Sequence, residues 1–186
     1  ESYAVGNISY SEGINDDVNK FIWSDQDWDS RTPVIETLRD FARFFIGEDY
    51  TEGVAQGLLA LERNWEGPLI ANETVDDTLR QWQLMEQSAP PEVANNYRFQ
   101  MGLLRAYYDA YIRRRLIYET ELEKEMIRIK FLDKRIKYLE SLKGNDAFGI
   151  TISEDIKQFS LEMLKITRDQ NIMNAQRIEE RIRKFS

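Results

Sequence analysis

The stretch PEVANNYRFQMGLLRAYYDAYIRRRLIYETELEKEMIRIKFLDKRIKYLESLK, residues 91–143, decides the fold. After Pro91 it contains no proline, and Gly102 is its only glycine. Proline and glycine are the residues that most strongly interrupt helices. The stretch therefore predicts one continuous helix, about 80 Å long at the helical rise of about 1.5 Å per residue. The shorter helices expected before it cannot cover this length, so its far end requires a partner.

The partner is predicted to follow directly in the sequence. KGNDAFGI, residues 143–150, is a turn rich in Gly, Asn and Asp, and Thr151 to Glu154 has the capping-box spacing that opens a helix running to Phe185. Spacings of three and four residues between apolar side chains predict an antiparallel hairpin with coiled-coil-like packing. The first stripe is Leu122, Met126, Ile129, Leu132, Ile136 and Leu139, and the second is Ile152, Ile156, Phe159, Met163 and Ile166.

The second stripe is expected to slip near its end. Gln170 and Arg177 stand at positions where the pattern requires apolar residues, and apolar residues resume out of phase from Ile178. A stutter or a frayed helix end is typical of such a change of phase.

The region before the long helix predicts a bundle of short helices. Apolar residues recur at helical spacing, with proline or glycine near the ends. AVGNISY, residues 4–10, alternates in a way that fits one short strand. The expected fold class is all-α: four to five short helices, plus one long helix that continues into the antiparallel hairpin. The segments that carry the helical pattern are 14–23, 31–47, 50–68 and 72–91.

The composition excludes several kinds of chemistry. The 186 residues include no cysteine and no histidine. Disulfides, thiolate or imidazole metal ligands, and Ser-His-Asp or Cys-His nucleophiles are therefore excluded. We expect a folded, soluble protein, because 42% of the residues are hydrophobic but no stretch is long and apolar enough for a membrane span. We also expect no cofactor.

Charge and residue usage change along the chain. The net charge is −8, with acidic side chains in excess before residue 90 and basic ones after it. The acidic first half argues against nucleic acid as a partner. All four tryptophans and all four prolines precede residue 92, and Lys20 is the only lysine before residue 123. This shift predicts two regions, 1–120 and 121–186, joined inside a helix, and it also fits a fused chain whose two parts fold independently.

The segment SDQDWDSRTPVIE, residues 24–36, has the spacing of a calcium-binding loop. Asp25, Asp27, Asp29 and Glu36 occupy positions 1, 3, 5 and 12 of an EF-hand pattern. Ser30, however, stands where the sharp turn requires glycine. The favoured interpretation is an acidic corner between two helices, with Trp28 packed beneath it and Glu36 near a helix N-terminus.

A second acidic cluster lies in YSEGINDDVNK, residues 10–20. Glu12, Asp16 and Asp17 surround a glycine-bearing turn at a helix start. Carboxylates so placed would serve as general acid or base, or would bind sugar hydroxyls. The favoured alternative is that they stabilise the helix N-terminus.

The string YSEGINDDVNKFIWSDQDWDSRTPVIETLRDFARFFIG, residues 10–47, resembles part of a known enzyme family. It is similar to the region that follows the catalytic barrel in large bacterial glycoside hydrolases of the α-glucuronidase and α-N-acetylglucosaminidase-like kind. VAQGLLALERNWEGPL and FQMGLLRAYYDAYIRRRLIYETELE, which begin at residues 54 and 99, continue the resemblance. It covers residues 3–125 and includes neither the barrel nor the hairpin.

The resemblance implies a last barrel strand at NISYSEG, residues 7–13, with Glu12 at the mouth of the site. It implies a helical accessory domain that packs on a barrel, contacts a saccharide and is secreted or periplasmic. Without the barrel, Glu12 alone cannot supply a paired acid and nucleophile, so the chain by itself is not expected to hydrolyse a glycoside. The alternative is a non-enzymatic interaction module that docks a partner, or forms a homo-oligomer, through the hairpin.

Overall fold

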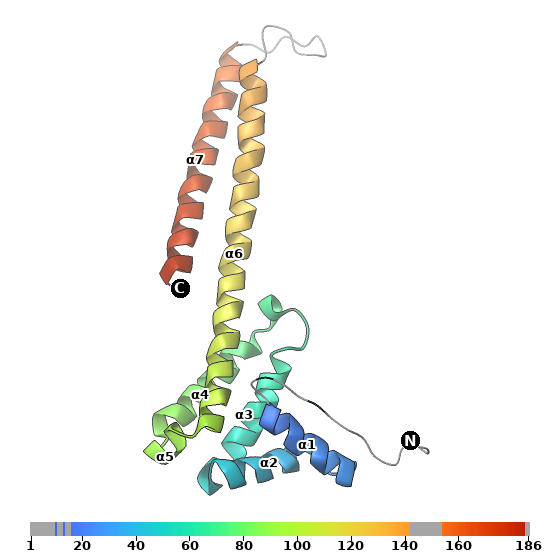
Figure 1. The fold of residues 1–186 in the computed structure, drawn as a ribbon. Coiled ribbons are helices and arrows are strands. Elements are labelled where there is room, and N and C mark those ends of the chain that lie inside the picture. Colours follow the sequence, from blue (N-terminus) through green and yellow to red (C-terminus); the bar gives the residue numbers. More distant parts are fainter. Residues whose placement is uncertain (1–9, 11–12, 14–15, 142–153, 185–186) are drawn as a thin grey trace, which may run out of the picture. The chain divides into compact units, whose positions relative to one another are not determined.

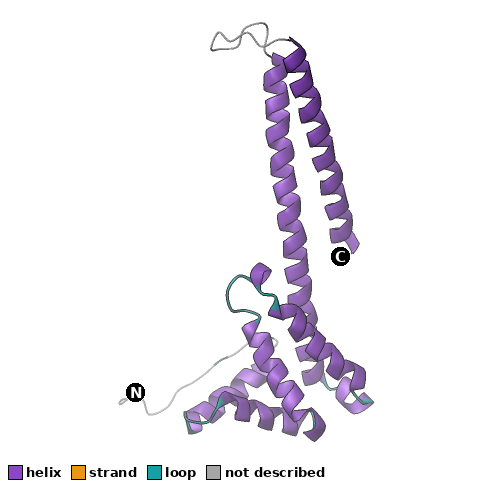
Figure 2. Ribbon diagram, turned by 180° about the vertical axis from the view of Figure 1, so that it is seen from behind, coloured by secondary structure: helices purple, strands orange, loops and turns teal. Residues whose placement is uncertain are grey.

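The structure is a computed structural model that describes residues 10, 13, 16–141 and 154–184. The predicted all-α fold is confirmed, and within these residues the chain forms helices and turns only (Figures 1 and 2). The expected strand at residues 4–10 and the expected capping box at residues 151–154 lie largely outside this part. The α-helices are α1 (Asp16–Trp28), α2 (Val34–Phe45), α3 (Thr51–Arg63), α4 (Thr74–Ser88), α5 (Pro91–Ala94), α6 (Tyr97–Ser141) and α7 (Glu154–Lys184), with 3-10 turns at Glu48–Tyr50 and Leu69–Ala71.

The chain divides into two compact units, residues 1–113 and 114–186. Helix α6 crosses the division without interruption. The predicted helix from residue 91 is broken once, because the Asn96 side chain accepts a hydrogen bond from the Arg98 backbone N–H (3.0 Å) and so caps the start of α6. The Asn96 amide also donates to the Phe45 carbonyl (2.6 Å), which ties this cap to the end of α2.

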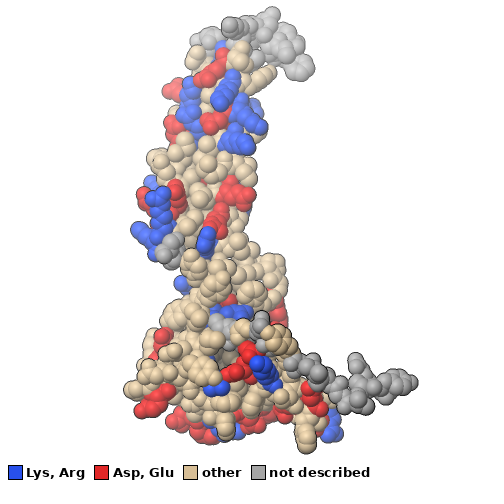
Figure 3. Space-filling view, viewed as in Figure 1, with Lys and Arg blue, Asp and Glu red and all other residues tan. Residues whose placement is uncertain are grey.

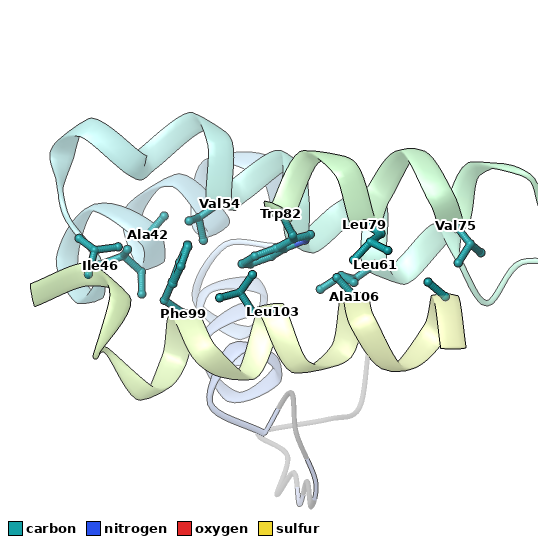
Figure 4. Packing of buried hydrophobic residues seen from close by; sticks show 12 residues of the cluster. Ala42, Ile46, Val54, Leu61, Val75, Leu79, Trp82, Phe99, Leu103 and Ala106 are labelled. Atoms are coloured by element: carbon teal, nitrogen blue, oxygen red, sulfur yellow. The ribbon is translucent and has the colours of Figure 1, made fainter. Parts of the chain in front are cut away.

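The core of the first unit is built around Trp82. Its indole is fully buried, and its Nε1 donates a hydrogen bond to the Gly57 carbonyl on α3 (3.3 Å). A Cβ atom at Gly102 of α6 would lie 2.1 Å from the indole Cη2, and one at Gly57 would lie 3.0 Å from the ring. The two glycines therefore let α3 and α6 approach the tryptophan of α4 (Figure 4).

Four polar side chains form a network at the edge of this core. Asp109 of α6 is 1% exposed, and it accepts hydrogen bonds from Asn64 (3.0 Å) and from Nε of Arg105 (2.9 Å). Asn64 in turn accepts from the Thr78 hydroxyl (3.1 Å). Since a buried carboxylate is costly unless it is paired and hydrogen-bonded, these bonds allow a charge to lie where three helices meet.

An ion pair ties α2 to α3 at the surface. Arg39 contacts Glu52 at 2.7 Å. The hydrogen bond from Arg39, and to a smaller extent the one from Gln56, lowers the pKa of Glu52 to about 2. Both side chains are partly in water, so screening limits what the pair contributes to stability.

The second unit is an antiparallel hairpin of α6 and α7 (Figure 1). On α6 the predicted stripe is largely correct: Ile136 is buried and its stripe neighbours are partly buried, but Met126 is exposed. On α7 the prediction is wrong for Phe159, Met163 and Ile166, which are exposed while Leu161 is buried. Ile152 and the side chain of Ile156, the other two residues of the predicted stripe, lie outside the described part. Among the buried and partly buried α7 side chains, one set recurs at alternating spacings of three and four residues without a slip: Leu161, Leu164, Arg168, Asn171, Ala175, Ile178 and Ile182.

The α7 prediction failed because the covered stripe contains polar residues. Arg168 and Asn171 occupy heptad positions that an apolar pattern search rejects, and Glu125 is buried on α6. Arg168 lies 3.6 Å from Asp133, and Lys165 pairs with Glu140 at 2.9 Å, across the two helices. These contacts compensate for the polar positions and align α7 with α6.

We expect alanine at Gly102 to destabilise the first unit by at least about 2 kcal/mol, because overpacking a rigid indole forces the surrounding helices apart. Alanine at Gly57 should destabilise the unit less than alanine at Gly102, since its Cβ would lie 3.0 Å from the ring instead of 2.1 Å. The matched control is Gly53→Ala, whose Cβ would meet only the flexible end of Met85. Urea unfolding monitored by tryptophan fluorescence measures the free energy of unfolding of this unit, because all four tryptophans lie in it. Equal stability of Gly102→Ala and the parent chain would contradict the packing described.

Candidate functional site

The first unit contains a pocket beside Trp82. Its volume is about 160 Å³. Asp16 and Asp17 of α1 and Tyr97 and Arg98 of α6 supply its polar groups. Its apolar walls include Phe41, Ile46, Val54, Leu58, Trp82 and Met101.

Asp17 is the centre of the polar groups at this pocket. It accepts a hydrogen bond from the Tyr97 hydroxyl (2.9 Å) and forms an ion pair with Arg98 (2.8 Å). The Arg98 guanidinium also lies over the ring of Phe45, 4.1 Å from its centroid, and over Tyr97 at 4.4 Å. Loss of hydration and the bond to Asp17 raise the pKa of Tyr97. These contacts orient Asp17 and Arg98 as a fixed pair.

Asp16 is also engaged in an ion pair. It contacts Lys20 one turn later on α1 at 2.5 Å, and this bond raises the pKa of Lys20. Both carboxylates are thus arranged as paired anions, which favours a binding role over proton transfer. Glu12, the third residue of the predicted cluster, lies outside the described residues.

Sequence reasoning found two of the pocket's polar residues and missed the others. Tyr97 and Arg98 are about 80 positions away from Asp17 in the sequence. Arg98 belongs to no recognisable motif, and its only local signal is the preceding Asn96, which predicts a helix start but no site. Tyr97 begins the aromatic run of residues 97–118, where a sugar-stacking surface is the alternative to the favoured interpretation of helix packing.

The residues of the calcium pattern engage different partners. Asp25 lies in the last turn of α1 and accepts a hydrogen bond from the Thr37 hydroxyl. Asp29 pairs with Arg31 at 2.9 Å, which lowers the pKa of the carboxyl, and Glu36 pairs with Arg39 at 2.6 Å. Asp27 is exposed in the last turn of α1. Within the described ranges, no three acidic side chains are grouped so that they could bind a metal ion.

Large apolar side chains are exposed in several places, including the α1–α2 region and the hairpin. Near the acidic corner Trp28 is 91% exposed, so the expectation that it packs beneath the corner is wrong. Phe44 of α2 is exposed as well. On the hairpin, Figure 3 shows uncharged surface between groups of charged side chains on the face in view. We call two sets of exposed hairpin residues the outer stripes: Ile127, Phe131 and Tyr138 on α6, and Phe159, Met163, Ile166 and Met173 on α7.

Comparison with known proteins gives no relative. No family model, curated protein or solved structure matches the chain. None of the helices in the described part is both long enough and apolar enough to cross a membrane. The candidate surfaces therefore have to be interpreted from their own chemistry.

We expect millimolar calcium to leave the fluorescence of the chain unchanged. The carboxylates of Asp25, Asp29 and Glu36 already bind three different side chains, and gathering them around an ion would break those contacts and unwind the last turn of α1. Exposed Trp28 is the reporter at this corner, and Trp28→Phe identifies its share of the signal. A saturable change that requires Trp28 and disappears in Asp25→Asn would establish the calcium site.

Proposed function

We propose that the protein is a helical interaction module whose hairpin associates with the hairpin of a second copy through the outer stripes. The observation that carries this proposal is an exposed apolar stripe on each hairpin helix, in addition to the side chains covered within the hairpin. At about 100° per residue, Phe131 lies about 140° around α6 from the buried Ile136. One stripe is covered within the hairpin and the other is open.

The spacing of the outer stripes fits a helical partner. Phe159, Met163 and Ile166 are separated by four and three residues, the pattern by which helices interdigitate. Contiguous exposed apolar surface of this kind marks an interaction site. A helix of the partner would thus pack against the outer stripe of α7, as α6 packs against the covered stripe of α7.

The flanking charges favour a second copy as the partner. Lys130, Lys134 and Lys137 are exposed beside the α6 outer stripe, whereas exposed Glu162 and Asp169 flank the α7 outer stripe. The α6 stripe of one copy is therefore complementary in charge to the α7 stripe of another. Because this contact joins two different surfaces, it is heterologous and can be repeated.

We expect the full chain to form dimers and larger species at high micromolar concentration, measured by light scattering after size-exclusion chromatography. Phe131→Glu and Ile166→Glu should each give a monomer with unchanged helicity, because a charge in an outer stripe opposes burial. The matched control is Gln176→Glu, an exposed α7 position outside the stripe. Ile136→Asp should instead reduce helicity, since Ile136 is buried inside the hairpin. A monomeric parent chain, or association that both stripe variants preserve, would contradict the proposal.

A second candidate function is the accessory domain of a bacterial carbohydrate-active enzyme. The observation that favours it is the exposure of two large aromatic side chains, Trp28 of α1 and Phe44 of α2, which are 91% and 79% exposed. Large exposed aromatic side chains are typical anchors of an interface. In this role one or both side chains would pack on a catalytic barrel, and the segment with Glu12 would contribute to the sugar site.

This second function predicts weak binding of glucuronic acid or N-acetylglucosamine to the chain, detected by saturation-transfer NMR. Glu12→Gln should abolish it, because the carboxylate that accepts hydrogen bonds from sugar hydroxyls is lost. Glu73→Gln, an exposed change elsewhere in the first unit, is the control. Equal binding by Glu12→Gln and the parent chain would remove the sugar-contacting role.

A further inference from the structure

The five methionines of the chain divide between the two units by exposure. Met85 and Met101 are partly buried in the first unit, whereas Met126, Met163 and Met173 are exposed on the hairpin. The exposed fractions of the three hairpin side chains are 53%, 48% and 45%. A reagent in water therefore reaches the thioethers of the hairpin more readily than those of the first unit.

The hairpin thioethers are the sulfur atoms most open to oxidation. The chain has no cysteine, so no thiolate competes with them for an oxidant. Hydrogen peroxide converts methionine to methionine sulfoxide, a polar group in place of an apolar one. The sulfur donates an electron pair to one peroxide oxygen, so an S–O bond forms and the O–O bond breaks. The second oxygen takes up the proton of the transferred hydroxyl group and leaves as water.

Two of these methionines lie in the surface proposed for self-association. Met163 and Met173 are two of the four side chains of the α7 outer stripe. Met126 is exposed as well, but it belongs to neither outer stripe. At about 100° per residue it lies about 140° around α6 from Phe131. Oxidation at Met163 or Met173 therefore changes an outer stripe, and oxidation at Met126 does not.

A sulfoxide in the outer stripe opposes its burial. The flexible thioether packs well between helices, whereas the sulfoxide oxygen needs a hydrogen-bond donor when a partner helix covers it. The outer stripe of α6 offers the apolar side chains of Ile127 and Phe131, with the Tyr138 hydroxyl as its one donor. Covering the modified side chain therefore costs free energy that covering the thioether does not.

We propose that Met163 and Met173 are sites of reversible oxidation by peroxides, and that their sulfoxides separate the associated copies. The inference rests on the self-association proposed above. Exchange with the monomer exposes both sulfur atoms, so the oxidant acts on the monomer and prevents it from associating again. Methionine sulfoxide reductases restore the thioethers, and the association returns with them.

Treatment of the full chain with hydrogen peroxide tests the proposal. At a concentration where light scattering shows association, peroxide should weaken that association about tenfold for each sulfoxide formed in the stripe. Mass spectrometry of proteolytic peptides identifies the oxidised methionines, and circular dichroism should show unchanged helicity. Two methionine sulfoxide reductases, one for each sulfoxide epimer, should then restore the original association.

Leucine and glutamine variants isolate the two sites. The double variant Met163→Leu, Met173→Leu keeps apolar side chains of similar size, so it should associate like the parent chain both before and after peroxide. The matched control is Met126→Leu, which removes an exposed methionine outside both outer stripes and should stay as sensitive as the parent. Met163→Gln should weaken association about tenfold without any oxidant, whereas Met126→Gln should leave it unchanged.

The rate of oxidation gives a second measurement, which does not depend on the sulfoxide weakening the contact. In the associated chain Met163 and Met173 should be oxidised more slowly than in the dilute chain, because a partner helix covers them. The rate at Met126 should be the same at both concentrations, since this side chain stays in water.

Persistent association after oxidation of Met163 and Met173 would overturn the inference. Dissociation of the double leucine variant by peroxide, or equal association of Met163→Gln and the parent chain, would do the same. Each of these results leaves the self-association itself in place. A chain that is monomeric before oxidation contradicts the proposed function instead, and the inference fails with it.

Discussion

The packing of Trp82 between two glycines is the constraint on which the first unit depends. The indole needs a carbonyl acceptor from Gly57 and a bare backbone at Gly102, so α3, α4 and α6 must all approach within contact of one ring. A large rigid side chain surrounded by glycines leaves few alternative arrangements, because it can neither shrink nor change rotamer freely in a dense interior. The other buried side chains, such as Phe99 and Val54, pack around this arrangement.

The same constraint explains where the pocket forms. Glycine at position 102 provides room for the indole but leaves no side chain to fill the space beside it, and Gly102 and Trp82 both line the pocket. The Asp17–Arg98 pair then bridges α1 and α6 at the polar side of that space. A buried polar network at Asp109 stabilises the same three helices further along α6. Rigid surroundings of this kind favour a pre-formed binding site.

The sequence predicts the helices well and their contacts less well, for physical reasons. Periodicity and the absence of proline identify α6, because helix formation is a local property. On α7, however, Phe159, Met163 and Ile166 form a better apolar pattern than the covered stripe, which includes Arg168 and Asn171. Which stripe is covered depends on ion pairs with α6, a long-range property. Asp16 and Asp17 are recognisable from their spacing, whereas Arg98 joins them only through folding.

The polar residues inside the hairpin also fix its alignment. A uniformly apolar heptad pattern would allow α7 to slide along α6 by seven residues with every side chain still facing a similar neighbour. Sliding by one heptad in either direction would separate Arg168 from Asp133 and Lys165 from Glu140, and it would leave the buried Glu125 among new neighbours. The imperfect stripe therefore exchanges some stability for a single register, as a buried polar residue does in coiled coils that must choose one partner alignment.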